Sequence, residues 1–180
     1  MRTLAIAVGQ LDNEQKGRVI ADNMRGVALE GWWQGNIPLG YSARKVPIGE
    51  DRGNKTKQRL TLERNKDTGD KVQTILERFS IGDITQAELA QYAENVGLRS
   101  SKGNVIGLQS IKALLTNITY TGHISNKSTD FEPIKGKHEA LISIDTYNRN
   151  QAILDGRKPD EATPHFSIEY PLKHALLCVN

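Results

Sequence analysis

The 180-residue sequence predicts an α+β fold: a long N-terminal helix, then a mainly helical domain with a helix-turn-helix-like core of three helices and a small antiparallel β-sheet. Three observations predict it. The first thirty residues place apolar side chains at helical spacing, a later stretch repeats the i, i+3, i+4, i+7 pattern three times, and short alternating segments separate the two. The single cysteine excludes a disulfide framework within the chain, and no apolar run reaches the roughly 18 residues of a membrane span.

The N-terminal helix is predicted over about the first thirty residues. Leu4, Val8 and Leu11 fall at helical spacing, and the pattern resumes after residue 19. The residues in between are almost wholly polar, so the apolar stripe is too thin to be buried along the whole helix. We therefore expect a projecting helix that ends at Gly31 or soon after, because glycine and proline follow closely.

Two strands are expected next. Apolar and polar residues alternate over 39–43 and 60–62, and the connector Ile48–Gln58 is expected to be an exposed, mobile hairpin loop. Trp32 and Trp33 lie together at the junction before the first strand. They are expected to anchor the end of the long helix to the core.

Three amphipathic helices follow. Their inward-facing positions are Val72, Ile75, Leu76 and Phe79, then Leu89, Tyr92, Ala93 and Val96, then Ile111, Leu114, Leu115 and Ile118. Thr85 and Glu88 have the spacing of a capping box at the start of the second helix. Gly82 and Gly97 are expected to end the first and second helices, and the third should start near Gly107.

In the C-terminal third of the chain, the sequence predicts a strand and a last helix. Thr119–Ile124 is predicted as a strand, and Ser143 as the N-cap of a helix that ends at Gly156. The apolar positions of that helix are Ile144, Tyr147, Ile153 and Leu154.

Charge is distributed unevenly along the chain. The formal net charge is +3, but residues 36–66 carry eight basic and three acidic side chains, and residues 98–138 carry six basic and two acidic ones. Folding could gather these basic blocks into a nucleic-acid footprint. The alternative is a solvated surface on which the charges average out.

The third helix of the core and the turn before it are the candidate DNA-contacting elements. The outward positions of that helix are Gln109, Ser110, Lys112, Ala113, Thr116 and Asn117, and the turn carries Arg99, Ser100, Ser101 and Lys102. Small hydrogen-bonding side chains can reach base edges, and basic ones can contact phosphates. A polar outer face is also typical of any surface helix, and this turn is longer than usual.

No enzymatic motif is present. The four histidines show no paired helical spacing, no glycine-rich phosphate loop precedes a helix, and there is no nucleophile elbow. Asp130 and Glu132 lie near His123 and His138 in the sequence and could seed a metal site, but solvated surface charge is the favoured interpretation.

Several segments together resemble large serine recombinases of the phage-integrase or transposon type. The run Gly31–Tyr41 resembles the family's junction between its long helix and a Pro-x-Gly-Tyr strand. Leu114–Gly122 resembles its Leu-x-Asn-x-x-Tyr-x-Gly signature. Asp12–Met24 is similar to the charged part of the long helix, His138–Ile144 to the segment before the last helix, and Tyr170–Cys178 to the lead-in to a zinc ribbon.

The resemblance implies a domain organisation and partners. Residues 1–33 would be the end of the linker helix that leaves the catalytic domain, 34–156 the recombinase DNA-binding domain, and 157–180 a linker with the start of a truncated zinc ribbon. The expected partner is double-stranded DNA, one half of an attachment site, with no membrane partner, a cytoplasmic location, and self-association through the long helix. No cofactor is expected in this chain, whereas the full-length protein should bind zinc with Cys178 as the first ligand. The family's nucleophilic serine has no counterpart here, so the chain should bind DNA without cutting it.

The resemblance also assigns the DNA contacts. The third helix of the core would enter the major groove through Ser110, Lys112, Ala113, Thr116 and Asn117. The segment up to the first strand would cross the minor groove with Gln34, Gly35, Asn36 and Tyr41. Phosphates would be contacted by Arg44, Lys45, Lys102, Lys127, Lys135 and Lys137. Arg99 and Ser101 of the turn are added to the DNA contacts because their side chains suit phosphate binding. Two rival interpretations are a stand-alone helix-turn-helix transcriptional regulator and a helical interaction module that binds no nucleic acid.

Overall fold

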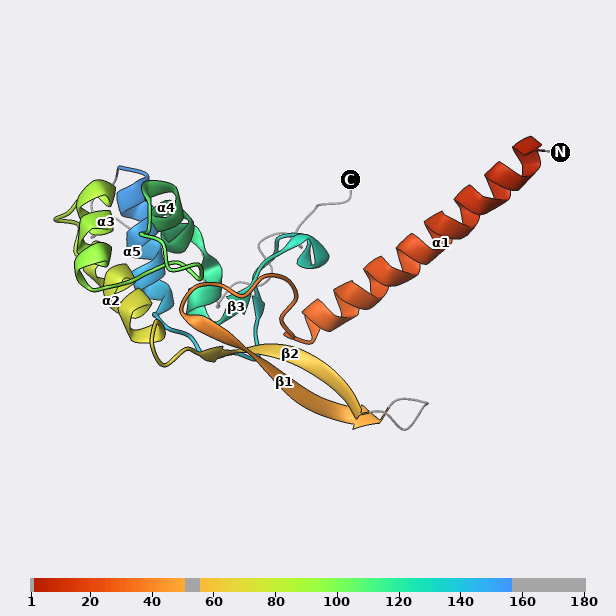
Figure 1. The fold of residues 1–180 in the computed structure, drawn as a ribbon, viewed down its shortest axis with the longest axis horizontal. Helices are drawn as coiled ribbons and strands as arrows, with labels where there is room; N and C mark the ends of the chain where they lie inside the picture. Colours follow the sequence, from red (N-terminus) through yellow and green to blue (C-terminus); the bar gives the residue numbers. More distant parts are fainter. Residues whose placement is uncertain (1, 51–55, 157–180) are drawn as a thin grey trace, which may run out of the picture. The chain divides into compact units, whose positions relative to one another are not determined.

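The computed structural model describes residues 2–50 and 56–156, with side chains over 13–49 and 56–156 (Figure 1). They fall into two compact units: the first lies within residues 1–38, 42–63 and 122–139, and the second within 39–41, 64–121 and 140–180. In this part of the chain, five α-helices accompany two two-stranded sheets, which confirms the predicted α+β class. None of the helices in the described ranges has the length and apolarity needed to cross a membrane.

The long helix is present as predicted: α1 spans Arg2–Leu29. Near its end Ala28 is fully buried, whereas Val19, Ile20 and Met24 are 46–60% exposed. Among the side chains of α1 that the structure describes, burial is therefore confined to Ala28 near its C-terminal end.

The end of α1 requires a glycine. Gly31 N donates to Ala28 O at 2.8 Å, and Trp32 N donates to Val27 O at 3.2 Å. Gly31 has φ +80°, and a Cβ there would lie 2.6 Å from the carbonyl oxygen of Lys135. Both the backbone conformation and the close approach of another segment disfavour a side chain at this position.

The two tryptophans anchor this junction within the first unit, as predicted. Trp32 is 8% exposed, and Lys137 Nζ lies 4.4 Å from the centroid of its ring. Trp33 N donates to Leu60 O at 2.9 Å, and the Trp33 ring meets His138 edge-on with centroids 6.2 Å apart.

The predicted hairpin is a longer ribbon than expected. Strands β1 (Tyr41–Glu50) and β2 (Thr56–Arg64) pair with each other. The expected loop over Ile48–Gln58 is wrong at both ends, because the two strands continue into it; positions 51–55 lie outside the described residues. Backbone pairing needs no apolar alternation, so the pattern in the sequence does not mark where the strands end.

The region after α4 is less extended than predicted. Ile118–Thr121 forms a 3₁₀ helix, η1, so the strand predicted over Thr119–Ile124 is wrong except at β3 (His123–Ile124), and Ile118 lies outside α4. The Oγ1 of Thr121 donates to Ile118 O at 2.8 Å. Such local side-chain hydrogen bonds stabilise a turn in place of an extended strand.

Strand β3 belongs to the first unit and pairs antiparallel with β4 (Ile134–Lys135). Between the two strands lies the short 3₁₀ helix η2 (Lys127–Thr129), whose N-cap Asn126 accepts a hydrogen bond from Ser128 N.

The second unit contains the predicted helices. They are α2 (Gly69–Phe79), α3 (Gln86–Asn95) and α4 (Leu108–Thr116), and their buried side chains include Val72, Ile75, Leu76, Phe79, Leu89, Ala93, Ile111, Leu114 and Leu115. The capping box is confirmed. Glu88 N donates to Thr85 Oγ1 at 3.3 Å, and Thr85 N donates to Glu88 Oε2 at 2.7 Å.

Helix α5 (Ile144–Leu154) is capped by Ser143, as predicted: Thr146 N donates to Ser143 Oγ at 3.0 Å. Its buried face differs from the predicted apolar set, which is only half-buried. The buried side chains of α5 are Asn148, Asn150 and Ala152. Asn150 is fully buried: its Nδ2 donates to Leu76 O at 3.1 Å, whereas its Oδ1 has no hydrogen-bond partner among the described residues.

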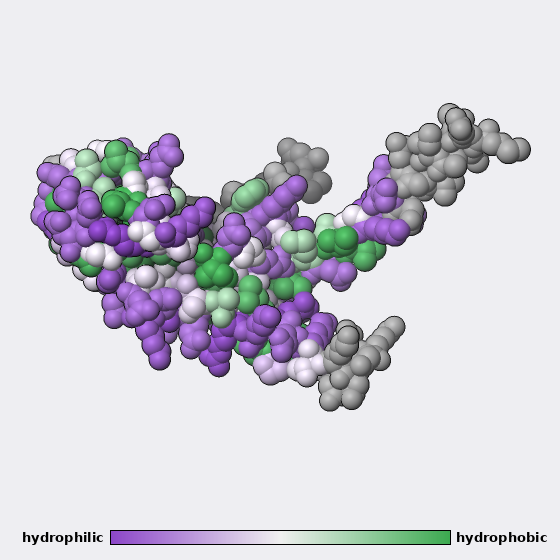
Figure 2. All heavy atoms as spheres, in the orientation of Figure 1, coloured by the Kyte–Doolittle hydropathy of each residue, from purple (hydrophilic) through white to green (hydrophobic). Residues whose placement is uncertain are grey.

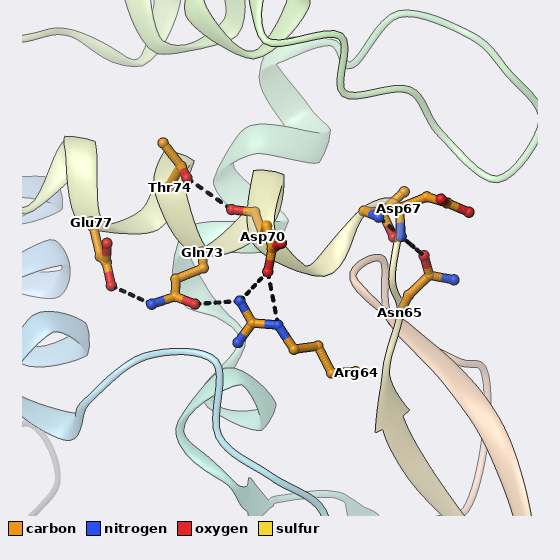
Figure 3. A network of polar contacts seen from close by, with 8 residues as sticks. Arg64, Asn65, Asp67, Asp70, Gln73, Thr74 and Glu77 are labelled. Atoms are coloured by element: carbon orange, nitrogen blue, oxygen red, sulfur yellow. Dashed lines mark hydrogen bonds and ion pairs between the residues drawn. The ribbon is translucent and has the colours of Figure 1, made fainter.

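A polar network fixes the start of α2 (Figure 3). Arg64 Nε donates to Asp70 Oδ1 at 3.0 Å, and Arg64 Nη2 donates to Gln73 Oε1 at 2.6 Å. Gln73 donates in turn to Glu77 at 2.7 Å, while Asn65 Oδ1 accepts from two backbone N–H groups of the following turn. Arg64, one cation of the basic block 36–66, is therefore engaged within the protein.

Candidate nucleic-acid interface

Helix α4 separates an apolar face from a polar one. Ile111, Leu114 and Leu115 are 0–7% exposed and face the core. The exposed side chains on the remaining surface of α4 include Gln109, Ser110, Lys112, Ala113 and Thr116. The outward positions predicted from the sequence are therefore accessible to a ligand.

The N-terminus of α4 is open. Its N-cap Gly107 makes no side-chain capping hydrogen bond, and the first turn contains no acidic residue. The first-turn N–H groups have no partner within a helix, and the helix dipole makes this end attractive to an anion. A phosphate oxygen is a suitable acceptor for such groups.

The long turn before α4 is ordered by its own backbone contacts. Arg99 and Val105 form an isolated antiparallel bridge, which holds the turn in a hairpin-like shape. Ser101 and Lys102 are exposed within it, whereas Arg99 is half-buried and lies 3.9 Å from the Glu94 carboxylate. The turn thus presents Lys102 to solvent and keeps Arg99 partly engaged.

Two predicted base-contacting residues form local hydrogen bonds. Thr116 Oγ1 donates to Lys112 O at 2.9 Å, and Asn117 Oδ1 accepts from Thr119 N at 3.0 Å. Asn117 is also the half-buried C-cap of α4. Substitution of Asn117 would alter the end of the helix as well as any contact with DNA.

The segment predicted to cross the minor groove lies in the first unit up to residue 38. Gln34 is half-buried and donates to Met24 O at 2.6 Å; its Oε1 is buried without a hydrogen-bond partner among the described residues. Gly35 and Asn36 are exposed, and Gly35 has φ +113° with no atom within 4 Å of an added Cβ. The backbone at Gly35 is therefore open to close approach by a ligand.

Tyr41 has a different environment from the other predicted contacts. It is 5% exposed, and its ring stacks on Tyr120 with centroids 5.9 Å apart and planes 10° from parallel. The Tyr120 hydroxyl donates to Leu39 O at 2.9 Å, and burial raises the pKa of Tyr120. These contacts give the tyrosine of the Asn-x-x-Tyr-x-Gly segment a structural role and leave little of Tyr41 on the surface.

The remaining predicted cations lie in the first unit. Arg44, Lys45, Lys127, Lys135 and Lys137 are all exposed. The Arg44 guanidinium lies 4.0 Å from the Glu63 carboxylate. The ribbon carries two further cations, Lys57 and Arg59, outside the predicted set; their two-residue spacing on a strand is the signal that could have identified them.

A surface hollow of about 270 Å³ lies between α2 and α3 in the second unit. Its lining residues are Arg78, Ile84, Glu88, Gln91, Tyr92 and Asn95. Arg78 pairs with Asp83, and this hydrogen bond lowers the pKa of the Asp83 carboxyl. The Thr85 N–H lowers the pKa of Glu88 in the same way. The ionised groups of the hollow are thus engaged in structural contacts.

No metal centre is found in the described ranges. Within residues 2–50 and 56–156, no group of three or more His, Cys, Asp or Glu side chains could hold a metal ion. The candidate set around Asp130 and His138 therefore does not form a metal site. The predicted zinc ligand Cys178 lies outside the described residues.

Comparison with known families defines the class of protein. The Recombinase family model matches residues 66–157, which is about half of the chain and includes α2 to α5. The chain therefore belongs to the Recombinase family. The match confirms the resemblance to recombinases inferred from the sequence.

Two solved structures share the fold. One is the crystal structure of an LSR–DNA complex, LSR standing for large serine recombinase, with a TM-score of 0.54 and 22% identity over 77% of this chain and 38% of that chain. The other comes from work on the sequence requirements of the Listeria innocua prophage attP site, with a TM-score of 0.51 and 23% identity over 76% of this chain and 50% of that chain. This chain thus spans half or less of those proteins. No curated protein sequence matches it.

Proposed function

We propose that this chain is the DNA-binding region of a site-specific serine recombinase and that it recognises one half of an attachment site in double-stranded DNA. The observation that carries the proposal is the exposed polar face of α4, which lies within the range matched by the Recombinase family. The DNA-bound state of the similar LSR structure supports the choice of partner.

In this proposal α4 lies in the major groove. Ser110 and Lys112 contact base edges, because both side chains are exposed on the outward face. The uncapped N-terminus of α4 and the exposed Lys102 contact the phosphate backbone, which fixes the register of the helix on the duplex.

The proposal extends to the full-length protein. Residues 34–156 form the DNA-binding domain, and the serine that cuts DNA is supplied by a catalytic domain joined through α1. Cys178 is the first ligand of a zinc ribbon. Self-association occurs through α1, supported by the exposed apolar side chains of Ile20 and Met24.

The test is selection of duplexes from a random pool, followed by fluorescence anisotropy with the selected and scrambled duplexes at about 50 and 200 mM salt. Lys112→Ala should weaken binding to the selected duplex by about tenfold and relax the preference at the base pair that it contacts, because a base-edge hydrogen-bond donor is lost. Ser110→Ala should reduce discrimination at one base pair by about tenfold.

Lys102→Ala is the matched control: it removes a phosphate contact, so it should lower the magnitude of the slope of log affinity against log salt by about one unit and leave the base preference unchanged. The proposal fails if no duplex is enriched, or if Lys112→Ala leaves both affinity and base preference unchanged.

A further inference from the structure

Part of the β1–β2 ribbon buries no side chain. At its base Tyr41, Thr61 and Leu62 are 3–6% exposed. In the distal ribbon, which we define as residues 43–49 and 56–59, no side chain is buried on either face. A two-stranded ribbon without a hydrophobic face is marginally stable by itself, so burial does not explain why these strands extend so far.

The charge of the distal ribbon is of one sign. Its ionisable side chains are Arg44, Lys45, Lys57 and Arg59, and it contains no acidic residue. Among the described residues Lys45, Lys57 and Arg59 form no ion pair, and the buried Arg59 Nε has no hydrogen-bond partner. Like charges on a ribbon repel one another, and among the described ion pairs only that of Arg44 with Glu63 offsets the repulsion. In Figure 2 the surface of the ribbon is mostly hydrophilic.

Three of these cations share one face of the ribbon, and the fourth lies on the opposite face. The contact between Arg44 and Glu63 places both on one face. Because side chains alternate along a strand, Lys57 and Arg59 share the face of Glu63, and Lys45 points to the opposite face. A ribbon that lies flat on a single polyanionic strand would need cations on one face only.

A groove with phosphates along both walls fits this distribution. The major groove of B-DNA is about 12 Å wide, and a strand layer with its side chains is about 10 Å thick. We propose that the distal ribbon enters the major groove of duplex DNA edge-first, with its cations toward the two phosphate backbones. This inference rests on the proposed function and adds a second, sequence-independent DNA contact to that of α4.

The experiment measures the salt dependence of affinity of the whole chain for a labelled random-sequence duplex. Lys57→Ala and Lys45→Ala should each lower the magnitude of the slope of log affinity against log salt by about 0.9, and the double variant by about 1.8. The base preference set by α4 should remain. Lys66→Ala, an exposed lysine between β2 and α2, is the charge-matched control and should keep the slope.

The outcomes separate the two proposals. If the unaltered chain binds no duplex, both fail. If it binds and the double variant keeps the wild-type slope, the role of the ribbon alone is wrong. If Lys57→Ala lowers the magnitude of the salt slope and Lys45→Ala does not, the ribbon contacts DNA through a single face. That result would overturn insertion into a groove. An equal decrease for Lys66→Ala would indicate a general charge effect and would also overturn it. Arg59 is left unaltered because its buried Nε could affect folding.

Discussion

Replacing Tyr120 by phenylalanine removes one hydroxyl from a buried site and leaves the aromatic ring in place against Tyr41. The hydroxyl donates to Leu39 O at 2.9 Å, so the variant loses one partly buried hydrogen bond. We expect Tyr120→Phe to lower the free energy of unfolding at pH 7 by about 1 kcal/mol. In a chain of this size that corresponds to a decrease in Tm of about 2–4 °C.

The difference in stability between the wild type and Tyr120→Phe should decrease at alkaline pH. Burial raises the pKa of Tyr120, whereas tyrosine in an unfolded chain titrates near 10. Its contribution to stability is therefore fully present below about pH 10 and is lost as the pH rises, because the unfolded chain releases a proton that the folded chain retains. The loss is about 1.4 kcal/mol per pH unit. Phenylalanine has no proton to release, so the difference in stability between the wild type and Tyr120→Phe should shrink above pH 10.

Urea unfolding at pH 7 and at about pH 11 measures both quantities. Tyr92→Phe, at a half-buried position on α3, is the control and should change stability at pH 7 by less than about 0.5 kcal/mol. Parallel stability curves for the wild type and Tyr120→Phe above pH 10, or equal stability at pH 7, would refute the role assigned to this hydroxyl.

Two further predictions concern the ends of helices. Gly31→Ala should destabilise the protein by about 1–3 kcal/mol, because φ is +80° and the new Cβ would lie 2.6 Å from Lys135 O. Gly26→Ala, inside α1 with no atom near the added Cβ, should raise stability by up to about 1 kcal/mol. Melting temperatures that shift in the same direction in both variants would contradict this contrast. The Thr85 N–H lowers the pKa of Glu88, so the contribution of Glu88 to stability is present above its ordinary pKa and is lost as the pH falls through the lower folded value. Glu88→Gln keeps a capping residue that does not titrate, and helical circular dichroism during acid titration should fall less steeply than in the wild type.

The helices of the second unit could be predicted because their burial follows local spacing. Ile111, Leu114 and Leu115 are buried where the i, i+3, i+4 pattern places them, and the exposed Ser110 and Lys112 follow from the same periodicity. The accessible part of the candidate interface on α4 was thus predictable from residue order alone.

Positions set by distant contacts could not be predicted. The buried Asn150 donates from its amide to Leu76 O, 74 residues away in the sequence, and no periodicity indicates such a partner. Tyr41 matches the family's junction motif, yet it stacks on Tyr120. The 3₁₀ helix at Thr121 depends on side-chain hydrogen bonds that compete with the β-propensity of threonine.

Gly136 and Lys137 form hydrogen bonds with three separate stretches of the first unit. Lys137 N donates to Gly31 O, Thr61 Oγ1 donates to Lys137 O across 76 positions, and Gly136 N donates to Gly122 O. On a ribosome that adds about 5–20 residues per second, Lys137 is added about 4–15 s after Thr61. During that interval the acceptor at the end of α1 and the donor on β2 remain without this partner, while α2, α3 and α4 are synthesised. The first unit is therefore completed only after α2, α3 and α4 have been synthesised, and a nascent chain stopped before residue 137 would keep its ribbon and its long helix unjoined by these bonds.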